Sequence, residues 1–229
     1  MTGPYPLDNP VRSSLTGPHA RFALRRGNVL RYPDDVSPFT GLPDQPDDAD
    51  WADLAALTGP GGFAAIAGGL PLPPGGWTVT PLGEGVQMID AGVEGAASAE
   101  AVQLTAADVP EMLDLTARTK PGPFLPRTEE LGTYLGIRRG GALVAMAGER
   151  LHPPGWTEIS AVCTDDEWRG HGLATVLIRA LVASIRARGE TPFLHALASN
   201  TSAIKLYEAL GFQLRTTLMF TGVTAPAGQ

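Results

Sequence analysis

Two short stretches in the C-terminal half of this chain constrain its fold more than any other feature. The first runs from Val162 to Thr175 and reads VCTDDEWRGHGLAT. It predicts the end of an apolar strand, a short polar turn, and an amphipathic helix that opens at a glycine-rich loop. The second runs from Asn200 to Phe212 and predicts a helix that begins at an amide side chain and ends at a glycine. Because each stretch joins a helix to a strand, the pair predicts a mixed α/β layer.

The sequence around these stretches supplies the rest of that layer. A helix is expected to begin near Asp108, because Asp108 and Glu111 have the spacing of a capping box. Gly140-Gly141 is a two-residue hairpin signal between strands expected at 134–139 and 142–151. The fold class expected is therefore α/β (α+β), with a mixed, mostly antiparallel sheet flanked by helices. The remaining strands are expected at 157–164, 193–198 and 212–222, and the remaining helices at 172–188 and 201–210.

The N-terminal half is less regular. Residues 1–20 are rich in Pro, Gly and Ser, which favours a loose or draped arm. Strand-like content at 22–32 and 77–89 flanks a helix expected at 47–57. A linker of small residues follows at 92–99.

This linker predicts two units, an N-terminal region at 1–95 and a C-terminal domain at 96–229. The N-terminal region has strand, helix and strand content, as a smaller α/β unit does. We therefore hypothesise that it is a degenerate copy of the C-terminal domain.

Composition and charge exclude several classes of function. No segment approaches the roughly 18 to 20 uninterrupted apolar residues of a membrane span, and the first residues lack the pattern of a secretory signal. Cys163 is the only cysteine, so no internal disulfide forms and a cytoplasmic location is expected. A net charge of −7 argues against binding nucleic acid or an anionic membrane. A homodimer is compatible with the sequence, which leaves the oligomeric state open.

The glycine-rich loop is a candidate phosphate site. A helix N-terminus carries free N–H groups and a partial positive charge, which attract phosphate. Gly170 and Gly172 leave room for a pyrophosphate to approach the backbone, and Arg169 adds a charged donor. An ordinary tight turn between a strand and a helix would also use two glycines. The spacing matches neither the dinucleotide fingerprint nor the lysine-containing phosphate loop.

The two stretches together resemble the GNAT (GCN5-related) N-acetyltransferase superfamily. Glu158 to Thr175 resembles its acetyl-CoA-binding motif, and the pattern Asn200, Tyr207, Gly211-Phe212 resembles the motif that follows it. The resemblance covers about residues 101–222. It implies the GNAT fold, acetyl-CoA (coenzyme A) as co-substrate, no metal, and a small-molecule or peptide amine as acceptor.

The resemblance also implies how the cofactor is held. In the family, the strand before the glycine loop splays from its neighbour at a bulge, and its free backbone groups bind the pantetheine arm. Asn200 is a good N-cap for its helix, and in the family an Asn here commonly binds the arm, so the two roles compete for one side chain. The positions implied for the arm are Val162, Cys163 and Thr164, and those implied for the pyrophosphate loop are Arg169, Gly170, His171, Gly172, Leu173, Ala174 and Thr175.

Tyr207 matches the family's general acid. Its phenol would protonate the departing CoA thiolate, provided that the two groups are held close together. The alternative is a helix tyrosine that fills the core, since Leu206 and Leu210 lie beside it. Cys163 is expected to be a small core residue, because direct transfer needs no nucleophile.

The base has three candidates. A primary amine is mostly ammonium at pH 7, so it has to lose a proton before it attacks. Glu158 lies on the strand that splays, where alternation places it on the same face as Ser160, Val162 and Thr164. Some protein-acetylating members of the superfamily carry Glu there. His195 on the neighbouring strand, or water, would serve instead.

The acceptor pocket is the least defined part of the site. The segment from Lys120 to Phe124 follows the first helix, where this fold commonly places a substrate-facing loop. Phe124, Glu129 and His195 are the candidate substrate contacts, although a stiff Pro-rich connection explains the segment equally well.

Two functions therefore follow from the sequence. The first is an N-acetyltransferase in which the amine attacks the thioester directly and Tyr207 acts as general acid. The alternative is a non-catalytic acyl-CoA-binding sensor or scaffold module. Tyr207 favours the enzyme, because a binding module has no need of a proton donor.

Overall fold

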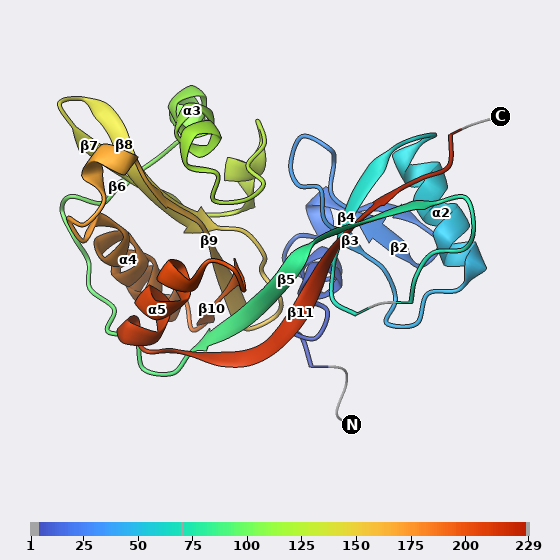
Figure 1. Cartoon of the computed structure of the whole chain (residues 1–229). Helices are drawn as coiled ribbons and strands as arrows, with labels where there is room; N and C mark the ends of the chain where they lie inside the picture. Colours follow the sequence, from blue (N-terminus) through green and yellow to red (C-terminus); the bar gives the residue numbers. More distant parts are fainter. Residues whose placement is uncertain (1–4, 70, 228–229) are drawn as a thin grey trace.

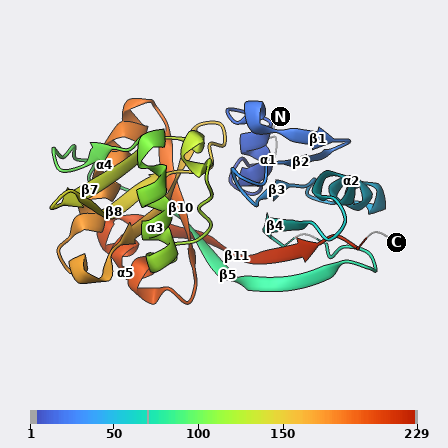
Figure 2. The same cartoon turned by 90° about the horizontal axis from the view of Figure 1, so that it is seen from above.

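A computed structural model of the chain describes residues 5–69 and 71–227. Figure 1 shows two lobes, one built from the middle and C-terminal parts of the sequence and one from residues 5–67. We call them the C-terminal lobe and the N-terminal lobe. Two long strands, β5 (Thr78–Asp90) and β11 (Phe212–Thr224), run from one lobe into the other. Seen from above in Figure 2, both strands pass along one side of the two lobes.

The C-terminal lobe has the element order that the sequence predicts. Helix α3 is followed by three antiparallel strands, then helix α4, strand β10, helix α5 and strand β11. The hairpin turns at Gly140-Gly141, as expected. The elements of this lobe are β6 (Val102–Gln103), η2 (Ala106–Asp108), α3 (Val109–Thr119), η3 (Thr128–Leu131), β7 (Tyr134–Arg139), β8 (Ala142–Glu149), β9 (Trp156–Thr164), η4 (Asp166–Trp168), α4 (Leu173–Ala187), β10 (Thr191–Leu197) and α5 (Thr201–Leu210).

The N-terminal lobe is more ordered than its composition suggests. The strand expected at 22–32 is a tight hairpin, and the helix expected at 47–57 is present with a capping box between Asp47 and Asp50. Its elements are α1 (Pro10–Leu15), η1 (Ala20–Phe22), β1 (Leu24–Arg26), β2 (Val29–Arg31), β3 (Thr40–Gly41), α2 (Asp48–Thr58) and β4 (Phe63–Ala67).

One eight-stranded sheet connects the lobes, in the order β4-β11-β5-β10-β9-β8-β7-β6. Its neighbouring strands are antiparallel except for the parallel pair β9 and β10. This confirms the mixed, mostly antiparallel sheet. Strands of 13 residues in β5 and β11 reach about 40 Å at the usual rise per residue, so they cross the whole molecule.

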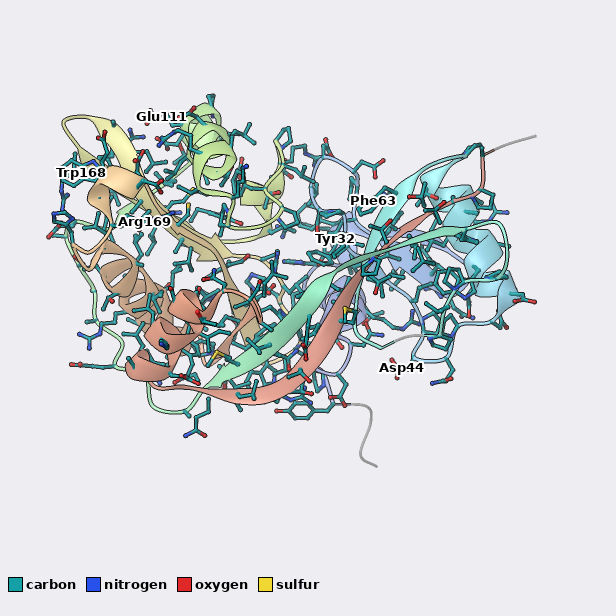
Figure 3. All side chains as sticks on the ribbon, viewed as in Figure 1. Tyr32, Asp44, Phe63, Glu111, Trp168 and Arg169 are labelled. Atoms are coloured by element: carbon teal, nitrogen blue, oxygen red, sulfur yellow. The ribbon has the colours of Figure 1, made fainter. Side chains whose placement is uncertain are left out.

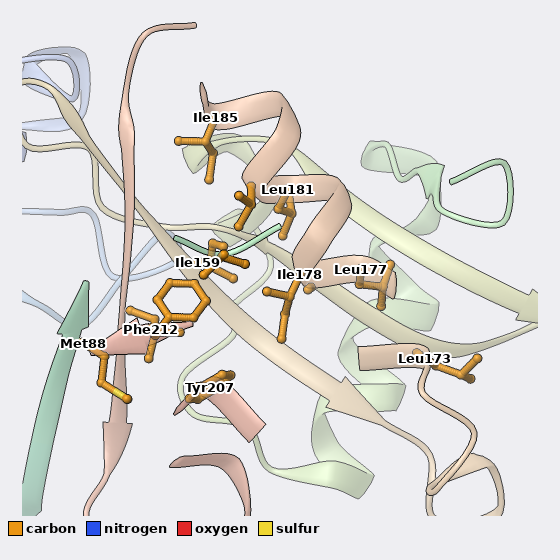
Figure 4. Close-up of a cluster of buried hydrophobic side chains, with 14 of the residues drawn as sticks. Met88, Ile159, Leu173, Leu177, Ile178, Leu181, Ile185, Tyr207 and Phe212 are labelled. Atoms are coloured by element: carbon orange, nitrogen blue, oxygen red, sulfur yellow. The ribbon is translucent and has the colours of Figure 1, made fainter. Parts of the chain in front are cut away.

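The main core lies between α4, α5 and one face of the sheet. Leu173, Leu177, Leu181 and Ile185 recur at helical spacing along α4 and are buried, as Figure 4 shows. Ile178 and Val182 are buried as well, so the apolar stripe is wide. On the other face of the sheet, α3 covers a smaller cluster around Met112, Leu115 and Tyr134.

Two expectations from the sequence are wrong. Of the loose or draped arm expected at residues 1–20, the described part is not loose, because Leu7, Val11 and Leu15 are buried in a cluster with side chains from both lobes. The capping box of α3 also lies one turn earlier than expected. Thr105 and Asp108 form it, whereas Glu111 accepts a hydrogen bond from Arg138 at 2.7 Å.

The division predicted between residues 95 and 96 falls in the connection between β5 and β6, and the sheet is continuous across it. Within the described ranges, no helix has the length and apolar content that a bilayer crossing requires. In those same ranges, no three His, Cys, Asp or Glu side chains are grouped so that they could hold a metal ion.

Candidate acyl-transfer site

The site begins where two parallel strands separate. β9 and β10 are paired from Trp156 to Ile159 on one side and from Thr191 to Leu194 on the other. Beyond these residues β9 pairs only with β8, and β10 pairs only with β5. The inner edge of β9 after Ile159 is therefore free of a partner strand.

A β-bulge at Ala161 accompanies the separation. The register with β8 shifts between Met146 and Gly148, and Ala161 has a left-handed φ of 51°. An extra residue in a strand reverses the faces of the residues that follow it. Ile159 and Val162 consequently both pack against the α4 side of the sheet, while Ala161 and Cys163 pack against the α3 side. The expectation that Glu158 and Val162 share a face is therefore wrong.

A cleft of about 440 Å³ lies at this separation. Ala161 and Val162 of β9 and Tyr207 of α5 line one part of it. The N-terminal lobe lines another part with Phe39 and Phe63, the latter labelled in Figure 3. The cleft is also lined by Ser160, by Lys120 to Pro123 after α3, by Arg150, and by His195, Leu197 and Phe220 of neighbouring strands.

The glycine-rich loop has the features of an anion site. Gly170 and Gly172 have φ of 80° and 75°, and a Cβ at either position would meet no atom within 4 Å. In the described structure, no backbone N–H from Gly170 to Thr175 donates to a protein acceptor. Six adjacent free donors at the N-terminus of a 15-residue helix suit a pyrophosphate. Arg169 is exposed at this loop and pairs with Asp166 at 2.8 Å.

Helix α5 brings two predicted residues to the cleft. The Asn200 side chain accepts a hydrogen bond from the N–H of Ala203 at 3.2 Å, which fixes its oxygen as the helix cap. Its amide N–H₂ makes no hydrogen bond within the described residues, so one side chain can cap the helix and still donate to a ligand. Tyr207 packs edge-on against Phe212, with ring centroids 6.1 Å apart. Burial raises the pKa of Tyr207 to about 12, so its phenol stays protonated at neutral pH.

Glu158 lies in a buried ion-pair network. Its carboxylate accepts from Arg150 Nε at 2.9 Å and Nη2 at 2.6 Å, and from His195 Nδ1 at 2.7 Å. Burial alone would raise the pKa of Glu158, but the Arg150 charge and these hydrogen bonds outweigh it and hold the pKa well below its ordinary value. Glu158 is therefore a carboxylate that already accepts three hydrogen bonds, two of them at Oε1.

Both ring nitrogens of His195 have hydrogen-bond partners. Arg215 donates to Gln87 Oε1 at 2.8 Å, so the Gln87 amide nitrogen faces His195 Nε2, 3.0 Å away. His195 Nδ1 lies 2.7 Å from the Glu158 carboxylate. His195 lines the cleft, as the sequence suggests for a substrate contact.

The other candidate residues have varied positions. Cys163 is buried and burial raises the pKa of its thiol to about 11, which fits a core residue. His171 is exposed in the loop, and its Nδ1 lies 3.2 Å from the Trp168 carbonyl. Phe124 is buried edge-on against Tyr134, and Glu129 is half-buried in η3. Both lie outside the lining of the cleft.

Sequence reasoning missed the residues that complete the acceptor side. Arg150 follows Glu149 directly after an apolar strand, and a charged pair there was a usable signal. Phe39 and Phe63 gave no signal, because they reach the cleft only when the N-terminal lobe packs beside it.

Comparisons with known proteins agree with this geometry. The model of the FR47-like protein family matches residues 134–221, which contain the splayed strands, the glycine-rich loop and α5. A crystal structure from Novosphingobium aromaticivorans, of a protein provisionally described as an acetyltransferase from the GNAT family, has a TM-score of 0.88 and 39% identity. That match covers 98% of this chain and 100% of the other.

Two curated relatives match over shorter stretches. They are the mycothiol acetyltransferases of Thermobispora bispora, 35% identical over 38% of this chain, and of Saccharopolyspora erythraea, 33% identical over 35% of it. These matches cover 32% and 27% of the relatives themselves, so the chain spans about a third of their length or less. The full-length match to the Novosphingobium protein, at 39% identity, shows that this chain belongs to the GNAT family of acetyltransferases.

Proposed function

We propose that this protein is an N-acetyltransferase that moves the acetyl group of acetyl-CoA directly to a primary amine on a small molecule or peptide. The observation that carries the proposal is the meeting, in one cleft, of the free edge of β9 and the side chain of Tyr207. Acetyl-CoA supplies the acyl group as a thioester. The free N–H groups of Gly170 to Thr175, the Asn200 amide and the backbone from Val162 to Thr164 are the groups that would hold it.

Tyr207 is the proposed general acid. As the new C–N bond forms and the C–S bond breaks, the thiolate takes the proton of the Tyr207 hydroxyl, and the proton lost by the amine returns to the phenol through solvent. A pKa of about 12 keeps this proton in place beforehand. The same burial that raises the pKa of the phenol also raises that of a thiol beside it, so the two values stay close enough for transfer.

The route for the amine proton has the same three candidates. Glu158 and His195 both lie close to the cleft, but Glu158 already accepts three hydrogen bonds and His195 Nε2 accepts one from Gln87. These contacts favour water as the first proton acceptor, with Glu158 and His195 positioning the groups around it.

We also propose that the N-terminal region, residues 1–95, works together with the domain at 96–229. Phe39 and Phe63 supply the wall of the cleft opposite α5, and β5 pairs with both β10 and β11. Residues of both units then form the acceptor cleft.

The first test is a calorimetric titration of acetyl-CoA into the wild type and Gly172→Glu. We expect micromolar binding that the variant loses, because Glu adds strain at a φ of 75° and puts a negative charge where phosphate would lie. Thiol release with a panel of primary amines should then follow in the wild type. If the wild type binds no acetyl-CoA, the enzyme proposal fails.

The second candidate is a non-catalytic acyl-CoA sensor. One observation favours it: the two titratable groups nearest the acceptor side, Glu158 and His195, are held in a satisfied network rather than left free. A sensor would bind acetyl-CoA and release no thiol with any amine in the panel.

A further inference from the structure

Arg150 is a buried cation with unused hydrogen-bond donors. Its exposed fraction is 9%, and its guanidinium carbon lies 5.0 Å from the centre of the Phe39 ring. Glu158 accepts from Nε and Nη2, which occupies the side edge of the guanidinium. Nη1 makes no hydrogen bond to any described residue, and it is not one of the atoms sealed from solvent. Because Arg150 lines the cleft, Nη1 opens toward it.

The edge of the Arg150 guanidinium that Glu158 does not occupy has a defined geometry. A guanidinium has five N–H donors, and its end-on fork, one N–H from each Nη, matches the two oxygens of a carboxylate. Glu158 takes the other edge, so this fork is the one that remains. Within residues 5–69 and 71–227, no acceptor takes these donors, so they are available to a ligand in the cleft.

The charge of the residues that line the cleft also favours a carboxylate as the ligand. Among the described residues that line it, Lys120 and Arg150 are cationic and none is a carboxylate. Glu158 neutralises Arg150 but is itself fully buried, and Lys120 makes no ion pair in the described structure. The uncompensated charge of the lining is therefore positive. An acceptor that was only an ammonium ion would find no countercharge there.

The rest of the acceptor wall is apolar. The Phe39 ring lies against Arg150 and the Phe220 ring lies 5.9 Å from that of His195. The apolar side chains that line the cleft are Phe39, Phe63, Leu82, Leu197 and Phe220. The whole volume, about 440 Å³, also has to receive the reacting end of the cofactor beside Tyr207. The volume that remains for the acceptor suits a small, largely apolar molecule.

From these observations we propose that the acceptor is an amino acid, an amine that carries a carboxylate and an apolar side chain, and that Arg150 binds the carboxylate end-on. This inference rests on the proposed acetyltransferase function and specifies its substrate class. Glu158 then holds Arg150 in place, while the amine is directed toward the bulge at Ala161 and Tyr207.

The test uses matched acceptors in which the carboxylate is replaced by an amide, which also gives the amide more free amine at neutral pH and so works against the expected preference. Thiol release is measured with L-phenylalanine and L-phenylalaninamide, and with L-leucine and L-leucinamide, using acetyl-CoA as donor. We expect kcat/KM to be at least tenfold higher for each acid than for its amide, mainly through a lower KM. Calorimetric titration of the same compounds into the CoA-saturated protein gives a readout that does not depend on turnover, and the acids should bind more tightly.

The variants distinguish a loss of carboxylate recognition from a loss of folding stability. Arg150→Gln alone would leave Glu158 buried without its partner, which is strongly destabilising. The double variant Arg150→Gln/Glu158→Gln keeps a neutral hydrogen-bonding pair, and it should fold, bind acetyl-CoA and lose the preference for acids. Arg139→Gln removes an arginine that pairs with Glu100 away from the cleft, and should keep the preference.

Each alternative outcome has one meaning. Amides used or bound as well as the acids, or a double variant that keeps the preference, would overturn the substrate class and leave the acetyltransferase function intact. Failure of either acid to bind the CoA-saturated protein would overturn it as well. Absence of acetyl-CoA binding would instead remove the proposed function itself.

Discussion

At the scale of single residues, the site depends on side chains that serve two purposes. Asn200 caps α5 with its oxygen and keeps its N–H₂ free, and Tyr207 packs against Phe212 while it lines the cleft. In both residues the structural role and the proposed functional role use different atoms. Substitutions that remove one set of atoms and keep the other can therefore separate the roles.

Tyr207→Phe removes only the phenolic hydroxyl group. We expect kcat to fall at least tenfold while the affinity for acetyl-CoA stays within twofold, because the ring packing against Phe212 is retained. Steady-state thiol release and calorimetry on the same preparation check this. Unchanged turnover would exclude Tyr207 as the acid.

Asn200→Asp separates the cap from the donor. Aspartate is as good an N-cap as asparagine, so the free energy of unfolding should change by less than about 0.5 kcal/mol. Acetyl-CoA affinity should fall roughly tenfold, because a donor is replaced by a negative charge. Asn200→Ala, the control, should lose about 1 kcal/mol of stability as well. Full affinity in Asn200→Asp would show that the amide N–H₂ contacts no cofactor.

At the scale of elements, the decisive feature is the bulged strand β9. Its pairing with β10 ends at Ile159, and the bulge at Ala161 turns the following residues to the opposite faces. Strand identity was predictable from the apolar run at 157–164. The bulge was expected only from the resemblance to a family, since alanine carries no sequence signal for a left-handed φ.

Ala161 offers a matched pair of variants. Ala161→Gly should be tolerated, with unfolding free energy within about 1 kcal/mol of the wild type, because glycine adopts a φ of 51° without strain. Ala161→Val should be destabilised by roughly 2 kcal/mol and should bind acetyl-CoA more weakly, since a β-branched residue resists this conformation. Urea unfolding and calorimetry measure both effects. Equal behaviour of the two variants would show that the bulge relaxes.

At the scale of the whole molecule, the two lobes meet through a buried polar contact. His19 of the N-terminal lobe donates from Nε2 to the Leu131 carbonyl at 3.1 Å and accepts from the Tyr32 hydroxyl at Nδ1, 2.8 Å away. The ring of His152 lies 4.8 Å from that of His19. Burial and the neighbouring His152 lower the pKa of His19 to about 3, and burial lowers that of His152. Both imidazoles are therefore neutral in the folded protein.

This contact predicts acid sensitivity. Below pH 6.5 His19 binds a proton in the unfolded chain but not in the folded protein. The free energy of unfolding therefore decreases as the pH falls from about 6.5 toward 3. The slope for His19 is at most about 1.4 kcal/mol per pH unit. Glu158, whose folded pKa is lowered, adds to the loss only below its unfolded value of 4.5. A change in the free energy of unfolding between pH 5 and 6.5 therefore reports on the histidines.

Urea midpoints between pH 5 and 8 measure this dependence. His19→Gln should flatten it, whereas His171→Gln, a change in the exposed loop, should leave the slope as it is. Parallel curves for wild type and His19→Gln would contradict the prediction.

The sequence by itself determined the elements of the C-terminal lobe and the local features of the proposed cofactor side of the cleft. The apolar periodicity of α4, the hairpin at Gly140-Gly141 and the cap at Asn200 are local signals that act within a few residues. The glycines at 170 and 172 likewise mark a local backbone conformation. Such features depend on residues that are close together in the chain, so they can be predicted without the tertiary structure.

Only the tertiary structure decided the acceptor side. Arg150, Phe39 and Phe63 come from distant parts of the chain, and they meet because β5 and β11 carry the N-terminal lobe alongside the separated strands. The ion pair and hydrogen bonds from Arg150 and His195 that hold Glu158 as a carboxylate also arise from this packing. Long-range contacts of this kind depend on how elements pack against one another, and the order of residues along the chain does not reveal them.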